Sequence, residues 1–104
     1  MIKISFEEFK QFLKVHMNDY DKDYVLRYAY AGEINRLSKE QIDEIVINFV
    51  NIIDAKFVLD HEIYVAIFKG RPFFENGVFF GEINPELSTE RKQEIFDFIH
   101  RVHH

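Results

Sequence analysis

The chain contains no cysteine and no tryptophan, and only two proline and four glycine residues among its 104 residues. Without cysteine, the protein cannot form disulfides, bind zinc through thiolates or use a thiol as a nucleophile. Hydroxyl nucleophiles are scarce too, because the only serine and threonine residues stand where helices are expected to begin. They are Ser5, Ser38, Ser88 and Thr89. The sequence therefore contains few residues suited to nucleophilic catalysis, and we do not expect an enzyme.

Long apolar runs and concentrations of positive charge are missing as well. No run approaches the roughly 20 residues of a membrane span, and the start of the chain does not resemble a signal peptide. The formal net charge is −5 and no basic stripe is visible, whereas nucleic-acid binding depends on Lys and Arg that neutralise phosphates. We therefore predict a cytoplasmic protein that binds neither membranes nor nucleic acids. An acidic surface suits a basic protein partner.

Aromatic residues are abundant, with twelve Phe and five Tyr. Hydrophobic residues make up 47% of the chain and charged residues 30%, which is typical of a globular composition. We expect residues 1–104 to form one domain around an aromatic core.

The segment from Leu37 to Asp54 is the clearest helix in the sequence. Ser38 is suited to cap its N-terminus, and Gln41 completes a capping box three residues later. Apolar residues then recur at helical spacing and cover one broad face. They are Ile42, Ile45, Val46, Phe49, Val50, Ile52 and Ile53. Because so wide a face needs neighbours on more than one side, we expect this helix to lie at the centre of the core.

Three further helices are predicted. A second capping box, Ser5 with Glu8, indicates a helix over residues 6–17. Residues 24–30 favour a helix capped by Asp21 or Asp23, although their alternating side chains also fit a strand. After Ser88, an apolar stripe at helical spacing indicates a helix that closes the chain.

The dipeptide Asn76-Gly77 is a strong hairpin signal, because both residue types tolerate the positive φ angles of a tight type I′ turn. Residues 73–75 and 78–80 would then pair as strands. An isolated hairpin is marginal in water and needs a third strand. The β-branched and aromatic run at residues 62–68 is the expected one, and a short helix between Asp60 and Gly70 is the alternative for that run.

Together these elements predict an α+β fold with three N-terminal helices, a three-stranded antiparallel meander and a C-terminal helix. The tetrapeptide Gly-Glu-Ile-Asn occurs at residues 32–35 and again at residues 81–84, and each copy leads into Leu-Ser-x-Glu. This repetition is consistent with an old duplication within the sequence, and equally with the residue types that commonly begin helices. A true repeat should show the same elements in both copies.

Two clusters hold residue types that bind metals elsewhere. Three alternating aspartates resemble the start of a calcium loop, but the glycine and the glutamate that the loop requires are replaced by Tyr24 and Tyr30. Three C-terminal histidines are spaced to share a helix face, and a helix dipole equally favours them there. The two sets are Asp19, Asp21 and Asp23, and His100, His103 and His104. We predict no metal and no cofactor.

The remaining candidates for function are surface residues. Phe73 opposes Phe80 and Phe74 opposes Phe79 across the hairpin, so one aromatic pair points to each side of the sheet. If the outer pair is Phe74 and Phe79, it forms an aromatic patch with Arg71 at its edge, and such residues are frequent interface anchors. Further candidate contacts are Ile47 on the polar side of the central helix and the tyrosines Tyr20, Tyr24 and Tyr28.

We therefore predict a protein that acts by binding another protein or a second copy of itself, as an inhibitor, immunity or regulatory factor does. The alternative is a small-ligand-binding or enzymatic domain that uses histidine and carboxylates in an aromatic pocket. A deep pocket where His16 or His61 meets a carboxylate would favour this alternative, because general acid–base catalysis needs both groups in a cleft. An exposed aromatic face would favour protein binding.

Overall fold

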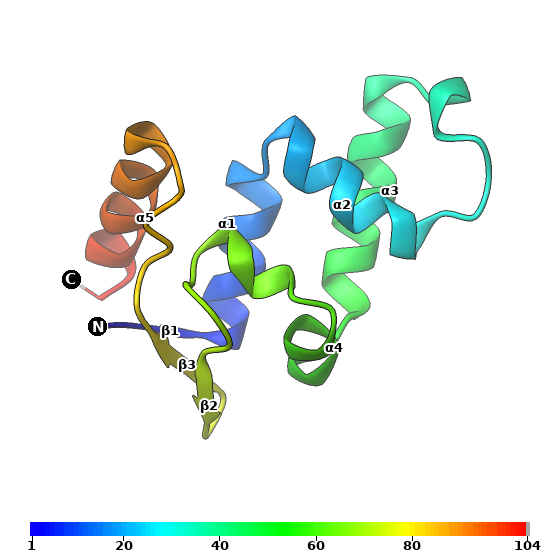
Figure 1. The fold of residues 1–104 in the computed structure, drawn as a ribbon. Coiled ribbons are helices and arrows are strands. Elements are labelled where there is room, and N and C mark those ends of the chain that lie inside the picture. Colours follow the sequence, from blue (N-terminus) through cyan, green and yellow to red (C-terminus); the bar gives the residue numbers. More distant parts are fainter. Residues whose placement is uncertain (104) are drawn as a thin grey trace.

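The protein has an α+β fold, described for residues 1–103 by a computed structural model (Figure 1). Five α-helices, two 3-10 turns and three strands follow one another along these residues. In chain order they are β1 (Ile2–Ser5), α1 (Phe6–His16), α2 (Asp19–Ala29), η1 (Ile34–Arg36), α3 (Lys39–Ile52), α4 (Ala55–Asp60), η2 (Ile63–Ala66), β2 (Phe73–Glu75), β3 (Val78–Gly81) and α5 (Thr89–Val102).

Helix α1 lies at the centre of the fold, with α5 on one side and α2 and α3 on the other (Figure 1). Its capping box forms as predicted, since the Ser5 hydroxyl accepts from the Glu8 N–H at 3.0 Å and Glu8 accepts from the Ser5 N–H at 2.8 Å. Phe9, Phe12 and Leu13 on this helix are fully buried. The core is therefore built around α1.

Helix α3 forms where the sequence predicts it, with its own capping box of Ser38 and Gln41. Its central position was predicted wrongly, because Val46 and Val50 are its only buried residues and Ile52 is 81% exposed. The chain also turns at Ile53, where Asp54 caps the separate helix α4 through the Phe57 N–H at 2.8 Å. The apolar face of α3 contacts α2 and α1, but Ile42, Ile45 and Phe49 on it are only partly buried against the core.

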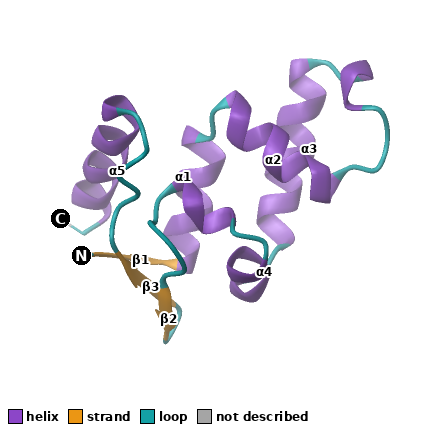
Figure 2. Cartoon of the chain, viewed as in Figure 1, coloured by secondary structure: helices purple, strands orange, loops and turns teal. Residues whose placement is uncertain are grey.

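The antiparallel sheet has the strand order β1–β3–β2 and lies at one end of the helices (Figure 2). The Asn76-Gly77 turn forms as predicted, with φ angles of +52° and +77° at its two residues. The carbonyl oxygen of Gly77 accepts from the Phe6 N–H at 2.8 Å. This bond ties the tip of the hairpin to the first residue of α1.

The prediction of a third strand at residues 62–68 is wrong. This segment forms η2, and only Phe68 makes an isolated bridge, to Ile83. Glu62 adopts a left-handed backbone with φ +58°, and this conformation prevents an extended strand from starting at residue 62. The third strand is β1, whose Ile4 pairs with Phe79 on β3. The sheet is thus completed by residues distant in the sequence, and it is not a meander.

The two Gly-Glu-Ile-Asn copies lead into different structures, and only the helices that follow them correspond. The first copy follows α2 and enters η1, whereas the second follows the hairpin and ends β3. Within residues 1–103, no helix combines the length and the apolar character needed to cross a membrane.

Candidate binding surfaces

The sheet distributes its phenylalanines between two faces. Phe79 is fully buried, and Phe74 lies half-buried beside it with ring centroids 4.6 Å apart. Phe73 is 62% exposed, and its ring lies 6.3 Å from that of Phe80 on the opposite face. The prediction that Phe74 and Phe79 form the outer patch is therefore wrong. Because β1 brings Ile4 onto the face of Phe79, that face closes against α1 and the outer pair is Phe73 with Phe80.

Arg71 and Ile47 face different neighbours. The Arg71 guanidinium donates to the Leu59 carbonyl oxygen at 3.2 Å and lies 3.6 Å from the Asp60 carboxylate, so it is drawn toward α4. Ile47 is 38% exposed and lines a hollow between α1 and α3 together with Val15. Their role in binding a partner stays a prediction.

A groove of about 200 Å³ opens between η2 and the part of the chain that joins α1 to α2. We call it the α2–η2 groove. Its floor is apolar and consists of buried side chains from three elements. They are Leu13, Met17, Val25, Ile63 and Ala66.

The rim of the α2–η2 groove is more exposed. Tyr20 at the start of α2 is 77% exposed, and Val65 on η2 is 39% exposed. Tyr24 forms a fixed wall, because its hydroxyl donates to the His61 carbonyl oxygen at 2.7 Å. Burial, together with the neighbouring Tyr28, raises the pKa of Tyr24 to about 12, so the hydroxyl keeps its proton at neutral pH.

Two carboxylates, Asp21 and Glu62, line the α2–η2 groove, and the charge of Asp21 is paired with Arg91. The Asp21 carboxylate accepts from the Arg91 guanidinium at 3.0 Å and from the Asn18 N–H at 3.4 Å, both through Oδ2. Burial raises the pKa of Asp21, and the charge of Arg91 offsets only part of this effect. Glu62 is exposed and stands at the left-handed position before η2.

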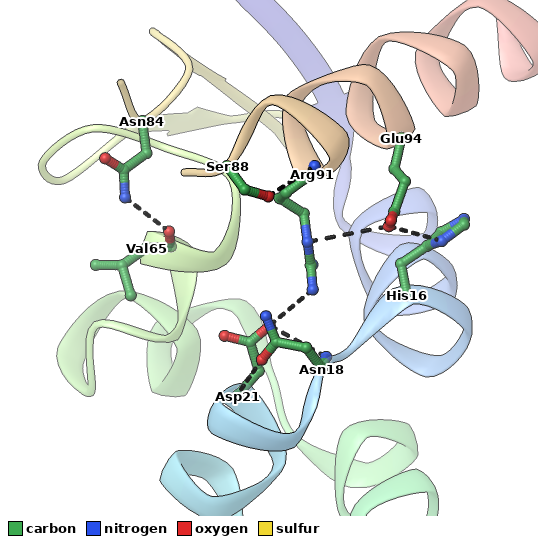
Figure 3. A network of polar contacts seen from close by, with 8 residues as sticks. All are labelled: His16, Asn18, Asp21, Val65, Asn84, Ser88, Arg91 and Glu94. Carbon is green, nitrogen blue, oxygen red and sulfur yellow. Dashed lines mark hydrogen bonds and ion pairs between the residues drawn. The ribbon is translucent and has the colours of Figure 1, made fainter. Parts of the chain in front are cut away.

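Arg91 is buried, with 6% exposure, and joins α5 to α2 through its bond to Asp21 (Figure 3). Its Nε lies 4.0 Å from a Glu94 oxygen that is also 3.1 Å from His16 Nδ1. Arg91 Nη1 and His16 Nε2 are enclosed and have no hydrogen-bond partner among the described residues. Removing one partner of such a buried ion pair is costly, because the other charge is left buried without compensation.

The two candidate histidines differ, because only His16 lies beside a carboxylate. His16 Nδ1 lies 3.1 Å from the Glu94 carboxylate, and both residues line an open hollow of about 480 Å³ together with Asp97 and His100. The other ring nitrogen of His16, Nε2, is enclosed by the protein. The His61 ring stacks on Phe57 with centroids 3.9 Å apart, and its Nδ1 lies 3.1 Å from the Phe57 carbonyl oxygen. The His61 ring therefore acts in packing, and His16 meets its carboxylate in an open hollow rather than in the deep pocket that would favour the enzymatic alternative.

The described residues include no group of three or more histidine and carboxylate side chains that could hold a metal ion. In the aspartate cluster, the Asp21 carboxylate accepts a hydrogen bond from Arg91, and Asp21 forms a capping box with Asn18. Of the histidine cluster, His103 lies 3.1 Å from the Glu8 carboxylate, and His104 falls outside the described residues.

No protein-family model, no curated protein and no solved structure matches this chain. Its function has to be argued from the surfaces described above. The sequence indicated Tyr20 and Tyr24 as contact residues, and both line the α2–η2 groove. Glu62 and Val65 were missed because their segment was assigned to a strand, and no signal in the sequence places them beside α2.

Proposed function

We propose that the protein acts by binding another protein, and that the α2–η2 groove receives a lysine or arginine side chain of this partner. The observation that carries the proposal is the composition of the groove, which has an apolar floor, a tyrosine at the rim and the carboxylate of Glu62, whereas Asp21 is already paired with Arg91. Long basic side chains bury their aliphatic stems on apolar surfaces and keep the charged end at a polar rim.

The size of the groove favours a single side chain over a whole small molecule. Its 200 Å³ lies below the roughly 300–1,000 Å³ of typical small-molecule sites. Tyr20 offers an exposed aromatic face at the rim, where a cation gains further attraction from the ring.

Charge supports the same choice of partner. The chain has a formal net charge of −5, and such a charge accelerates encounter with a basic protein. Glu62 forms no ion pair with residues 1–103, so its carboxylate is available at the rim. Its left-handed backbone is uncommon for glutamate, and such conformations concentrate at functional sites.

A photo-crosslinking amino acid at position 20, introduced in cells of the source organism, tests this proposal. The matched control carries the cross-linker in place of Phe96, which is 47% exposed on α5. We expect a protein adduct from position 20 that position 96 does not give. Equal adducts from both positions, or none from position 20, would contradict the proposal.

Glu62→Gln then tests the charge. We expect about two- to fivefold weaker binding of the captured partner, as for a partly exposed ion pair. Glu40→Gln, which removes an exposed acid on α3, should leave binding unchanged. A small molecule retained in native mass spectrometry, without any protein adduct, would support the small-ligand alternative.

A further inference from the structure

The outer face of the sheet carries two opposite charges at diagonal corners. The register places Lys3, Phe80 and Phe73 in one row across the three strands, and Ser5, Val78 and Glu75 in the next row of the same face. Lys3 and Glu75 thus stand at opposite corners, with the apolar side chains of Phe73, Phe80 and Val78 between them. Lys3, Phe73 and Glu75 are exposed, and Phe80 and Val78 are half-buried.

Lys3 and Glu75 do not neutralise each other within one chain. Strands about 4.8 Å apart and a rise of about 3.4 Å per residue put their Cα atoms on the order of 12 Å apart. Neither side chain forms an ion pair with any residue in the described range 1–103. Both charges are therefore available to a second molecule.

The free edge of β2 is a poor alternative surface. The strand has only three residues, and Pro72 before it has no N–H to donate. Short edge strands and proline are features that oppose the addition of another strand. Strand addition at β2 is therefore disfavoured, and the face beside it is the candidate surface for a partner.

We propose that two copies of this chain associate through their outer sheet faces. A two-fold axis that lies between the sheets, along the diagonal from Ser5 to Phe73, stacks the outer face of one copy on that of the other. It places Lys3 of each copy over Glu75 of the other and brings the two Phe73 rings together. Self-complementary contacts of this kind define an isologous dimer, and the strands would cross steeply, near the orthogonal class of sheet packing.

The expected association is weak. Six residues a side are fewer than the roughly 20–30 in a standard interface. The interface is also independent of the proposed partner site, because it uses neither Tyr20 nor Glu62. Either proposal can fail while the other stands.

Charge reversal tests the proposed axis. Lys3→Glu alone and Glu75→Lys alone each replace two attractive contacts by two repulsive ones. We expect each variant to self-associate about tenfold more weakly than the parent in sedimentation equilibrium at up to roughly 1 mM protein in low salt. The control Glu40→Lys makes a similar charge change on α3 and should leave self-association within about threefold of the parent.

Two combinations should restore association. An equimolar mixture of the Lys3→Glu and Glu75→Lys proteins pairs opposite charges at both corners, and so does the double variant with itself. We expect both to recover to within about threefold of the parent. Restoration by the mixture is specific, because it requires position 3 of one copy to meet position 75 of the other.

The parent protein provides a measurement that does not depend on variants. Its amide NMR shifts should change with concentration at Lys3, Phe73, Glu75, Val78 and Phe80, and remain constant at Tyr20 and Glu62. A monomer at 1 mM, shifts confined to other surfaces, or single and mixed variants that behave alike would overturn the proposal.

Discussion

On the inner face of the β-sheet, Phe79 packs against the rings of Phe6, Phe9 and Phe68, and it is fully buried. On the outer face, Phe73 contacts the ring of Phe80 and is 62% exposed. The residue type is the same and the positions lie on neighbouring strands. The difference comes from β1 and α1, which close one face and leave the other open. Strand parity therefore sorts the phenylalanines of this sheet between two faces, and the packing of β1 and α1 decides which face is buried.

The largest expected effect comes from the inner face. Phe79→Ala removes a ring that is enclosed by four other phenylalanine rings, so we expect a loss of about 3–5 kcal/mol in the free energy of unfolding. Urea denaturation followed by circular dichroism measures this loss. A midpoint close to that of the parent would show that the inner face does not belong to the core.

Phe74→Ala tests the edge of the inner face. Phe74 contacts Phe79 but is only half-buried, so less apolar surface is lost and we expect a cost of about 1–2 kcal/mol. The same denaturation experiment applies. A loss as large as that of Phe79→Ala would place Phe74 fully in the core.

Gly77→Ala tests the turn that sets the register of the two faces. A Cβ at Gly77 meets no atom within 4 Å, so only the backbone at φ +77° is strained. We expect a loss of about 1–2 kcal/mol. Gly70→Ala is a matched control, because its φ is +66° and its surroundings are equally open. A much larger loss for Gly77→Ala alone would mean that the register itself had changed.

The capping box that joins β1 to α1 supplies a pH-dependent contribution. Burial opposes ionisation of Glu8, but the Ser5 N–H and His103 bonds outweigh it, and the pKa of Glu8 lies below its ordinary value. A lowered carboxyl pKa stabilises the fold above the pKa of the unfolded chain, and the contribution is lost as the pH falls through the folded value. Glu8→Gln should therefore cost about 0.3–1 kcal/mol at pH 7.

The difference between the parent and Glu8→Gln should shrink in thermal melts as the pH falls below the ordinary pKa of glutamate. Glu7→Gln is a suitable control, because Glu7 is exposed and lies outside the capping box. A difference that persists unchanged at acid pH would mean that the charge of Glu8 does not contribute.

The sequence predicts those parts of the fold that depend on near neighbours. The capping boxes at Ser5 and Ser38 need only residues three positions apart, and the Asn76-Gly77 turn needs only two adjacent ones. The third strand could not be assigned in this way. Both residues 2–5 and residues 62–68 have strand-like composition, and the choice depends on the left-handed Glu62 and on contacts across the chain.

The same limit applies to the candidate sites, where the sequence predicts only the residues that local spacing identifies. Tyr20 and Tyr24 are recognisable from their spacing, but Glu62 and Val65 reach the groove only because the fold brings η2 to its other side. Strand alternation predicts that the phenylalanines split into two pairs. It does not say which pair is buried, because that depends on where α1 lies.

The most direct test of this account compares one ring deletion on each face. Phe73→Ala should cost about 0.5 kcal/mol or less, because the side chain is mostly exposed and loses only its contact with Phe80. Phe79→Ala, measured by urea denaturation in the same series, should cost at least about six times as much. Losses of similar size for the two variants would contradict the division of the sheet into a buried and an open face.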